Sequence, residues 1–78
     1  MARGVVLDWT LGDRLRKARE YAGLERKDMA EAFGVTARTI LNWERGRGVP
    51  RCDQGELCET WGQVTGVSPR WLEFGKRT

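Results

Sequence analysis

The stretch from Glu25 to Gly46, ERKDMAEAFGVTARTILNWERG, constrains the fold of this chain more than any other part of it. Apolar residues recur there at helical spacing on both sides of a short break: Met29, Ala30 and Phe33 before it, and Val35, Ile40 and Trp43 after it. This periodicity predicts two short amphipathic helices. The break is too short for anything but a tight turn between them.

The residues at the break support that prediction. Gly34 stands where the first helix must end in a left-handed residue, a conformation that glycine adopts without steric cost. Thr36 is placed to cap the second helix, because its hydroxyl can accept a backbone N–H of the first turn. Two short helices joined in this way are the sequence form of a helix-turn-helix motif.

The chain as a whole is short and lacks the residues that many other classes of protein need. Its 78 residues are enough for one domain with one core. It has no histidine, and its two cysteines, Cys52 and Cys58, do not form the paired spacing of a structural zinc site. The apolar run near the N-terminus is too short for a signal peptide or a membrane span. We expect a cytoplasmic protein with free thiols and no cofactor, although pairing of the two cysteines stays open.

Charge is distributed unevenly along the chain. The net charge is only +3, but eleven of the fourteen basic residues are arginines, the side chain suited to bidentate contact with phosphate and guanine. Between positions 37 and 51 there are four arginines and one acid, Glu44, whereas positions 53–59 are acidic. This asymmetry is typical of an edge that faces DNA. The alternative is an ordinary solvated loop.

The remaining segments extend the pattern to five helices, expected at about 11–22, 26–33, 37–45, 54–65 and from 69 onward. Thr10 and Asp13 form a capping box for the first helix, with Trp9 as a hydrophobic staple. The apolar face expected for the fourth helix consists of Leu57, Cys58, Trp61 and Val64. We therefore predict an all-α domain over residues 10–75, preceded by an arm or short strand at 1–9 and followed by a tail at 76–78.

Three separated segments together resemble one family. They are RLRKAREYAGL at 14–24, DMAEAFGVTARTILNWERG at 28–46 and TGVSPRWLEFG at 65–75. In this order they resemble the lambda-repressor-like DNA-binding domains, the Cro/repressor (XRE-type) group, and most of all small phage Cro-type repressors. The resemblance implies a compact five-helix fold whose second and third helices form the helix-turn-helix.

The resemblance also implies which residues read DNA. The third helix would lie in the major groove, with Ala37, Arg38, Leu41 and Asn42 towards the base edges. Arg38 is suited to the O6 and N7 atoms of guanine, and Asn42 to an adenine edge or a phosphate. Leu41 departs from the family pattern, which has a polar residue there. It would contact a thymine methyl group or pack against the following loop.

A second set of residues would hold the DNA backbone: Arg26, Lys27, Thr36, Thr39, Arg45, Arg47 and Arg51. The resemblance further implies a structural ion pair between Arg19 and Glu44, whose disruption in a buried site would cost about 3–5 kcal/mol. Glu25 is a second departure from the pattern. It stands at the cap of the second helix, where its charge would repel a phosphate.

Trp71 and Phe74 are the expected dimer contacts, because members of the family often associate through this end of the domain. Folding of Phe74 onto the first helix is the alternative. We expect a weak homodimer, formed either free in solution or only on DNA, with half-sites about 34–36 Å apart. Since the sequence ends shortly after this helix, no further domain is expected.

The function implied is a sequence-specific transcriptional regulator in the cytoplasm of a bacterial or phage-infected cell. It would be a Cro-type repressor that occludes a promoter by binding a double-stranded operator, with no small-molecule ligand. The alternative is a protein-binding module of the antitoxin, anti-repressor or excision-control type, because fold does not fix function. An enzyme is not expected, since neither cysteine has a matching base. The operator, the regulated gene and the choice between repression and activation stay open.

Overall fold

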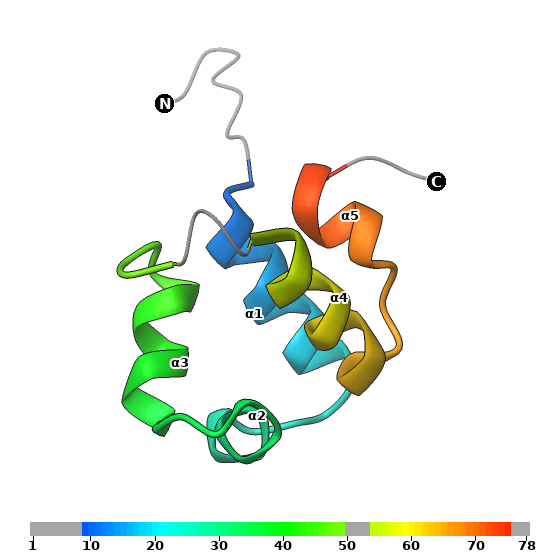
Figure 1. Ribbon diagram of the computed structural model, residues 1–78. Coiled ribbons are helices and arrows are strands. Elements are labelled where there is room, and N and C mark those ends of the chain that lie inside the picture. Colours follow the sequence, from blue (N-terminus) through cyan, green and yellow to red (C-terminus); the bar gives the residue numbers. More distant parts are fainter. Residues whose placement is uncertain (1–8, 50–53, 76–78) are drawn as a thin grey trace, which may run out of the picture.

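A computed structural model describes residues 9–49 and 54–75 of the chain (Figure 1). Within these ranges the chain forms five α-helices and no strand: α1 (Leu11–Tyr21), α2 (Arg26–Phe33), α3 (Ala37–Glu44), α4 (Gln54–Thr65) and α5 (Pro69–Phe74). The predicted all-α, five-helix fold is therefore confirmed. The tail predicted at 76–78 and all of the predicted N-terminal arm except Trp9 lie outside the described residues.

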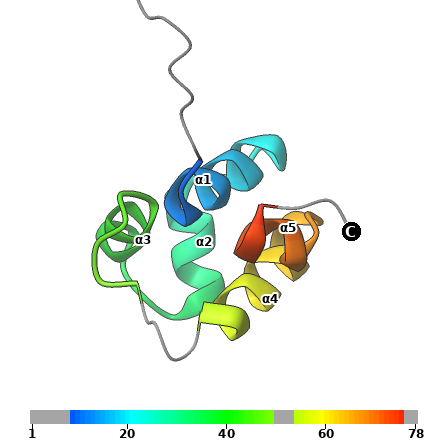
Figure 2. The same cartoon turned by 90° about the horizontal axis from the view of Figure 1, so that it is seen from above.

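Helix α1 lies between two groups of helices. Two perpendicular views place α3 on one side of α1 and α2, and α4 with α5 on the other (Figures 1 and 2). α1 is in contact with α3, α4 and α5, and α2 is in contact with α3 and α4. The arrangement leaves α3 at an edge of the molecule, with one face towards α1 and α2 and the opposite face towards solvent.

The start of α1 follows the expected capping box. The N–H of Asp13 donates to Oγ1 of Thr10 (3.2 Å), and the N–H of Thr10 donates to Oδ2 of Asp13 (3.0 Å). Trp9 does not act as a local staple, because the residue it would have to meet on α1 is Arg14. Its ring packs edge-on against Trp71 of α5 instead, with the ring centroids 6.3 Å apart.

The core takes side chains from all five helices. Its fully buried members are Leu15, Met29, Ile40, Cys58, Trp61 and Leu72. Phe33 fills the space beside them, with its ring 5.6 Å from that of Trp43 and 5.5 Å from that of Trp61. The buried indole N–H of Trp61 donates to the carbonyl oxygen of Leu15 (3.0 Å), so this large side chain joins α4 to α1 without an unpaired polar atom.

One residue predicted for the core face of α4 is not buried. Val64 is 37% exposed, and Thr65 is buried in its place. Counting in steps of four from Leu57 gives Trp61 and then Thr65, whereas Val64 is rotated towards solvent. The hydroxyl of Thr65 donates to the carbonyl oxygen of Trp61 (2.8 Å), which makes its burial tolerable.

Candidate nucleic-acid interface

The turn between α2 and α3 has the predicted local geometry. Gly34 ends α2 in the left-handed region at φ 69°, and Thr36 stands at the N-cap of α3 in an extended conformation. Oγ1 of Thr36 accepts the N–H of Thr39 (3.2 Å), and the two threonine hydroxyls lie 3.0 Å apart. Both hydroxyls therefore belong to the cap of α3, at a position open to solvent.

The outward face of α3 carries the residues expected to read bases. Ala37 and Arg38 are exposed, while Leu41 and Asn42 are half-buried. Arg38, Leu41 and Asn42 are three and four positions apart, so the helix brings them onto one face. Neither the guanidinium of Arg38 nor the amide of Asn42 makes a hydrogen bond to another described residue. The part of the chain that the structure describes therefore leaves both polar groups without a partner.

The opposite face of α3 packs into the core. Ile40 is fully buried and Trp43 nearly so, which confirms the expected core role of both residues. Leu41 is partly covered but is not among the apolar side chains packed on the core. Helix α3 therefore separates into a polar outer face and an apolar inner face at helical spacing.

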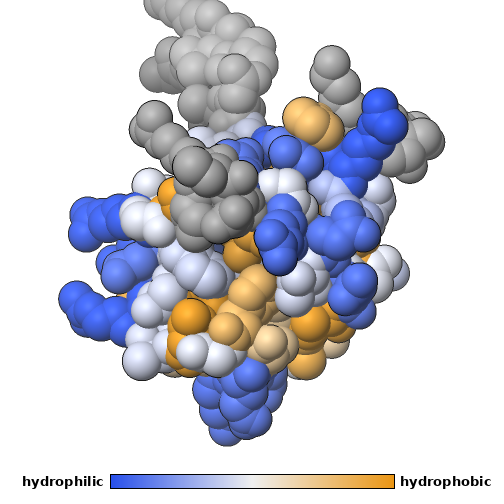
Figure 3. Space-filling view, in the orientation of Figure 1, coloured by the Kyte–Doolittle hydropathy of each residue, from blue (hydrophilic) through white to orange (hydrophobic). Residues whose placement is uncertain are grey.

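Basic side chains continue past the end of α3. Arg45 and Arg47 are both exposed, and the backbone N–H of Arg47 returns to the carbonyl oxygen of Asn42 (2.7 Å), which folds the loop back on the helix. In Figure 3 hydrophilic side chains project from the side of the molecule where α3 lies. Arg51, expected to join this group, lies outside the described residues.

A buried ion-pair network fixes the C-terminal end of α3. Nε of Arg19 on α1 lies 2.7 Å from Oε2 of Glu44, so these two residues form the ion pair that the resemblance implied. Nε of Arg26 at the start of α2 lies 3.0 Å from Oε1 of the same carboxylate. The side chains of Glu44, Arg19 and Arg26 are 2%, 10% and 39% exposed. One carboxylate thus joins three helices.

The backbones of α1 and α3 also approach closely at this end. A methyl group added to Gly12 would stand 2.8 Å from the carbonyl carbon of Glu44 and 3.0 Å from the carbonyl oxygen of Trp43. The first distance is shorter than real Cβ atoms show, and the second is tighter than most real Cβ contacts. Glycine at this position of α1 therefore permits the helix contact on which the position of α3 depends.

The start of α2 has a mixed charge. Lys27 is exposed, and its Nζ lies 3.7 Å from Oε2 of Glu25, an exposed pair that contributes little to stability. The backbone N–H of Glu25 donates to Oδ2 of Asp28 (2.8 Å), so the carboxylate of Asp28 supplies a polar partner at this helix end. Glu25 itself directs its charge to Lys27, next to the backbone amides of the first turn.

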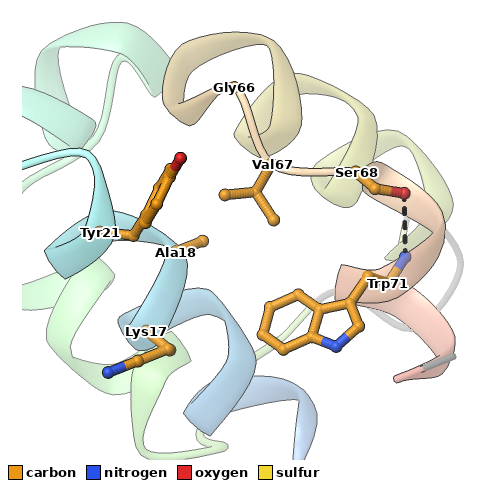
Figure 4. Close-up of a pocket in the computed structure, with 7 residues that line it drawn as sticks. All are labelled: Lys17, Ala18, Tyr21, Gly66, Val67, Ser68 and Trp71. Carbon is orange, nitrogen blue, oxygen red and sulfur yellow. Dashed lines mark hydrogen bonds between the residues drawn. The ribbon is translucent and has the colours of Figure 1, made fainter. Parts of the chain in front are cut away.

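The residues expected at a dimer contact lie on the other side of the molecule. Phe74 is exposed and Trp71 is half-buried. Trp71 also lines a groove of about 590 Å³, in which Ala18 and Tyr21 of α1 lie across from Val67 and Trp71, while the ammonium of Lys17 points away from them (Figure 4). Tyr21 is 78% exposed at this groove.

Sequence reasoning missed two arginines whose partners are distant in the chain. Arg14 donates to the carbonyl oxygens of Leu72 (2.8 Å), Trp9 (2.7 Å) and Glu73 (3.0 Å), and so joins the start of α1 to the end of α5. The pairing of Arg26 with Glu44 was the second omission. Neither pairing leaves a local spacing signal, although Glu44 gave one indirect sign: an acid in the last turn of a helix is locally unfavourable and needs a partner elsewhere.

The described residues offer little for other chemistry. No three His, Cys, Asp or Glu side chains among them gather where they could hold a metal ion. Burial and, to a smaller extent, the nearby Glu73 carboxylate raise the pKa of the Cys58 thiol to about 11 against the opposing charge of Arg14, so this thiol is protonated near neutral pH. Cys52 lies outside the described residues. None of the described helices is both long and apolar enough to span a membrane.

Comparison with known proteins gives one finding. A family model described as a helix-turn-helix domain matches residues 10–63, which include α1, α2 and α3 and most of α4. Neither the curated proteins nor the solved structures include a match to this sequence.

Proposed function

The chain belongs to the helix-turn-helix domain family, and from this premise we propose that it is a sequence-specific DNA-binding transcriptional regulator with α3 in the major groove. One observation carries the proposal. Arg38 stands exposed on the outer face of α3, without a hydrogen bond to any described residue, while two further exposed arginines follow at the end of the same helix.

Arg38 is the proposed principal base reader, because its guanidinium can bond O6 and N7 of one guanine. Asn42 and Leu41, on the same face, and Ala37, beside Arg38 at the start of the helix, complete the proposed reading set. The proposed phosphate contacts are Arg26, Lys27, Thr36, Thr39, Arg45, Arg47 and Arg51. Contacts of this second kind position the protein on the duplex without reading its sequence.

Repression of the Cro type is the proposed outcome, with the bound protein occluding a promoter that overlaps its operator. The proposed assembly is a weak homodimer held through Trp71 and Phe74. The exposed phenyl ring of Phe74 supports this, since it lies three positions from the half-buried Trp71 on the same helix, so one partner surface could cover both aromatic side chains. Sedimentation of Phe74→Ser with and without DNA tests the assembly, and an unchanged association state would remove Phe74 from it.

The function is tested by selecting binding sites from randomised duplex DNA at physiological salt and then measuring variants. Arg38→Ala should lose about 1–3 kcal/mol of binding free energy and relax the preference at one base position. Arg47→Ala should weaken binding to all sequences and lower the slope of log K against log salt by about one. Arg70→Ala, which removes an exposed arginine of α5, is the matched control and should bind as the wild type does.

A protein-binding module remains the second candidate, and the groove between α1 and the α4–α5 segment is the observation that favours it. An exposed tyrosine and a half-buried tryptophan at a groove are typical of protein contacts. Selection without enrichment of any duplex would favour this candidate. Enrichment of one sequence, lost in Arg38→Ala, would favour DNA binding.

A further inference from the structure

We propose that Glu44 is a positioning residue for DNA binding, and that it holds the guanidinium of Arg26 by one edge so that the other edge meets a DNA phosphate. This inference rests on the proposed DNA-binding function. It assigns to Glu44 a role beyond its ion pair with Arg19. The phosphate contact of Arg26, at the start of α2, would then depend on Glu44 at the end of α3.

Arg19 alone already gives Glu44 a bidentate partner. Nε and Nη2 of Arg19 lie 2.7 and 3.4 Å from the two carboxylate oxygens, and Nη1 donates to the carbonyl oxygen of Leu24 (2.9 Å). All three nitrogens of this buried guanidinium are therefore occupied. Two guanidinium groups and one carboxylate give the network a net charge of +1, and its exposed end is Arg26.

Arg26 is engaged through Nε only. No described residue accepts a hydrogen bond from its Nη1 or Nη2. The side chain is 39% exposed, although its Nε pairs with a carboxylate whose side chain is only 2% exposed. The side chain is thus held at Nε, while its terminal nitrogens Nη1 and Nη2 make no hydrogen bond to a described residue.

The geometry of the guanidinium links the contact with Glu44 to the orientation of the terminal nitrogens of Arg26. The group is planar and rigid, so a contact at Nε sets the direction in which the two terminal nitrogens point. Those terminal nitrogens form the edge that binds a phosphate in a bidentate manner. Holding the side chain before binding lowers the entropy lost on contact. Lysine would have to make both contacts through one nitrogen, so it lacks a second, rigidly oriented edge that can bind the phosphate in a bidentate manner.

Two substitutions of Arg26 separate positioning from charge alone. Arg26→Met should lower the slope of log K against log salt by about one, measured with a duplex of random sequence between about 50 and 200 mM salt. Arg26→Lys retains the charge, so its slope should stay near that of the wild type. Its affinity should nevertheless fall about 3- to 10-fold, because the fixed fork is lost.

Arg16 offers a matched control. Its Nε also pairs with a glutamate, Oε2 of Glu20, at 3.1 Å, but this is an exposed i,i+4 pair within α1. Arg16→Met and Arg16→Lys should leave both the affinity and the slope unchanged. Thermal unfolding of each variant supplies the structural readout, and the midpoint of Arg26→Met should change little because Arg19 still neutralises Glu44.

The outcomes are distinct. Equal binding by Arg26→Lys and the wild type would overturn the positioning role, since charge alone would then suffice. A lower unfolding midpoint with an unchanged salt slope in Arg26→Met would show a purely structural network and also overturn it, even while Arg47→Ala still weakens binding. If the wild type shows no salt-dependent binding to any duplex, the proposed function fails together with this inference.

Discussion

Helix α1 meets its neighbours in two different ways on its two sides. Towards α3 the contact is close: Gly12 brings the backbones together, and Arg19 reaches a carboxylate that is almost fully buried. Towards the α4–α5 segment the helices are joined near the start of α1 by Arg14 but separate into a groove near Tyr21. The same helix thus has one tightly packed side and one partly open side.

The difference agrees with the two roles that we propose, namely base reading by α3 and association with a second protein molecule on the α5 side. A base reader must be held in a defined orientation by its scaffold, and the close contact with α1 supplies this for α3. A surface that receives a second protein molecule can remain open until that molecule arrives. If this comparison is right, substitutions on the α3 side should cost far more stability than substitutions in the groove.

The largest effect is expected for Glu44→Gln. Glutamine keeps the shape of the side chain but removes the carboxylate that pairs with Arg19, whose side chain is 10% exposed. An uncompensated buried charge should lower the free energy of unfolding by about 3–5 kcal/mol. Chemical denaturation measures the change, and Glu31→Gln on the exposed surface of α2 is the control, with an expected change within about 0.5 kcal/mol. A loss below about 1 kcal/mol would contradict the view that the contact between α1 and α3 is tightly coupled to stability.

The next effect tests the backbone contact. Gly12→Ala places a methyl group against the backbone of Glu44, which cannot rotate away as a side chain would, so α1 and α3 must separate. We expect a loss of about 2 kcal/mol by thermal or chemical unfolding, in spite of the better helix propensity of alanine.

Gly55→Ala in α4 is the matched control for that substitution. Among the described residues, its added methyl group would meet only the Glu73 carboxylate, at 3.5 Å, which is an ordinary contact. This variant should be stabilised by up to about 1 kcal/mol. Similar changes in the two glycine variants would mean that helix propensity, not helix contact, governs position 12.

The sequence predicted the local features of this fold well and the long-range ones poorly. Periodicity, the glycine at position 34 and the threonine caps are local signals, so the five helices and the turn could be predicted from them. Val64 was placed in the core because it continues an apolar pattern, although the helical step from Trp61 leads to the polar Thr65. A buried polar residue is invisible to a hydrophobic pattern.

In the candidate site, too, the local features could be predicted and the long-range contacts could not. The exposed face of α3 could be predicted from spacing, whereas the partners of Arg14 and Arg26 come from other helices and depend on how the helices pack. Arg26 was assigned to phosphate by resemblance alone. Its contact with Glu44 required the arrangement of α2 against α3, which no local pattern contains.

Substitutions of Arg14 and Arg16 test the contact between the start of α1 and the end of α5. Arg14→Met removes donors to three backbone carbonyls and should cost about 1–2 kcal/mol of unfolding free energy, since the freed carbonyls can partly turn to water. Arg16→Met removes only an exposed pair with Glu20, whose contribution is about 0.3–0.5 kcal/mol. Denaturant titration of both variants gives the difference, and equal losses would show that the Arg14 contacts add no stability.

The smallest effect on stability is expected in the groove itself. Tyr21 is 78% exposed and its ring packs on little of the core, so Tyr21→Ser should change the free energy of unfolding by less than about 0.5 kcal/mol. The same substitution removes an aromatic wall of the groove opposite Val67 and Trp71 (Figure 4). Any change should therefore appear in association, measured by sedimentation over a range of protein concentrations, and not in folding. A loss above about 1 kcal/mol would mean that Tyr21 supports the fold, and the open side of α1 would then be as tightly coupled to stability as the side that holds α3.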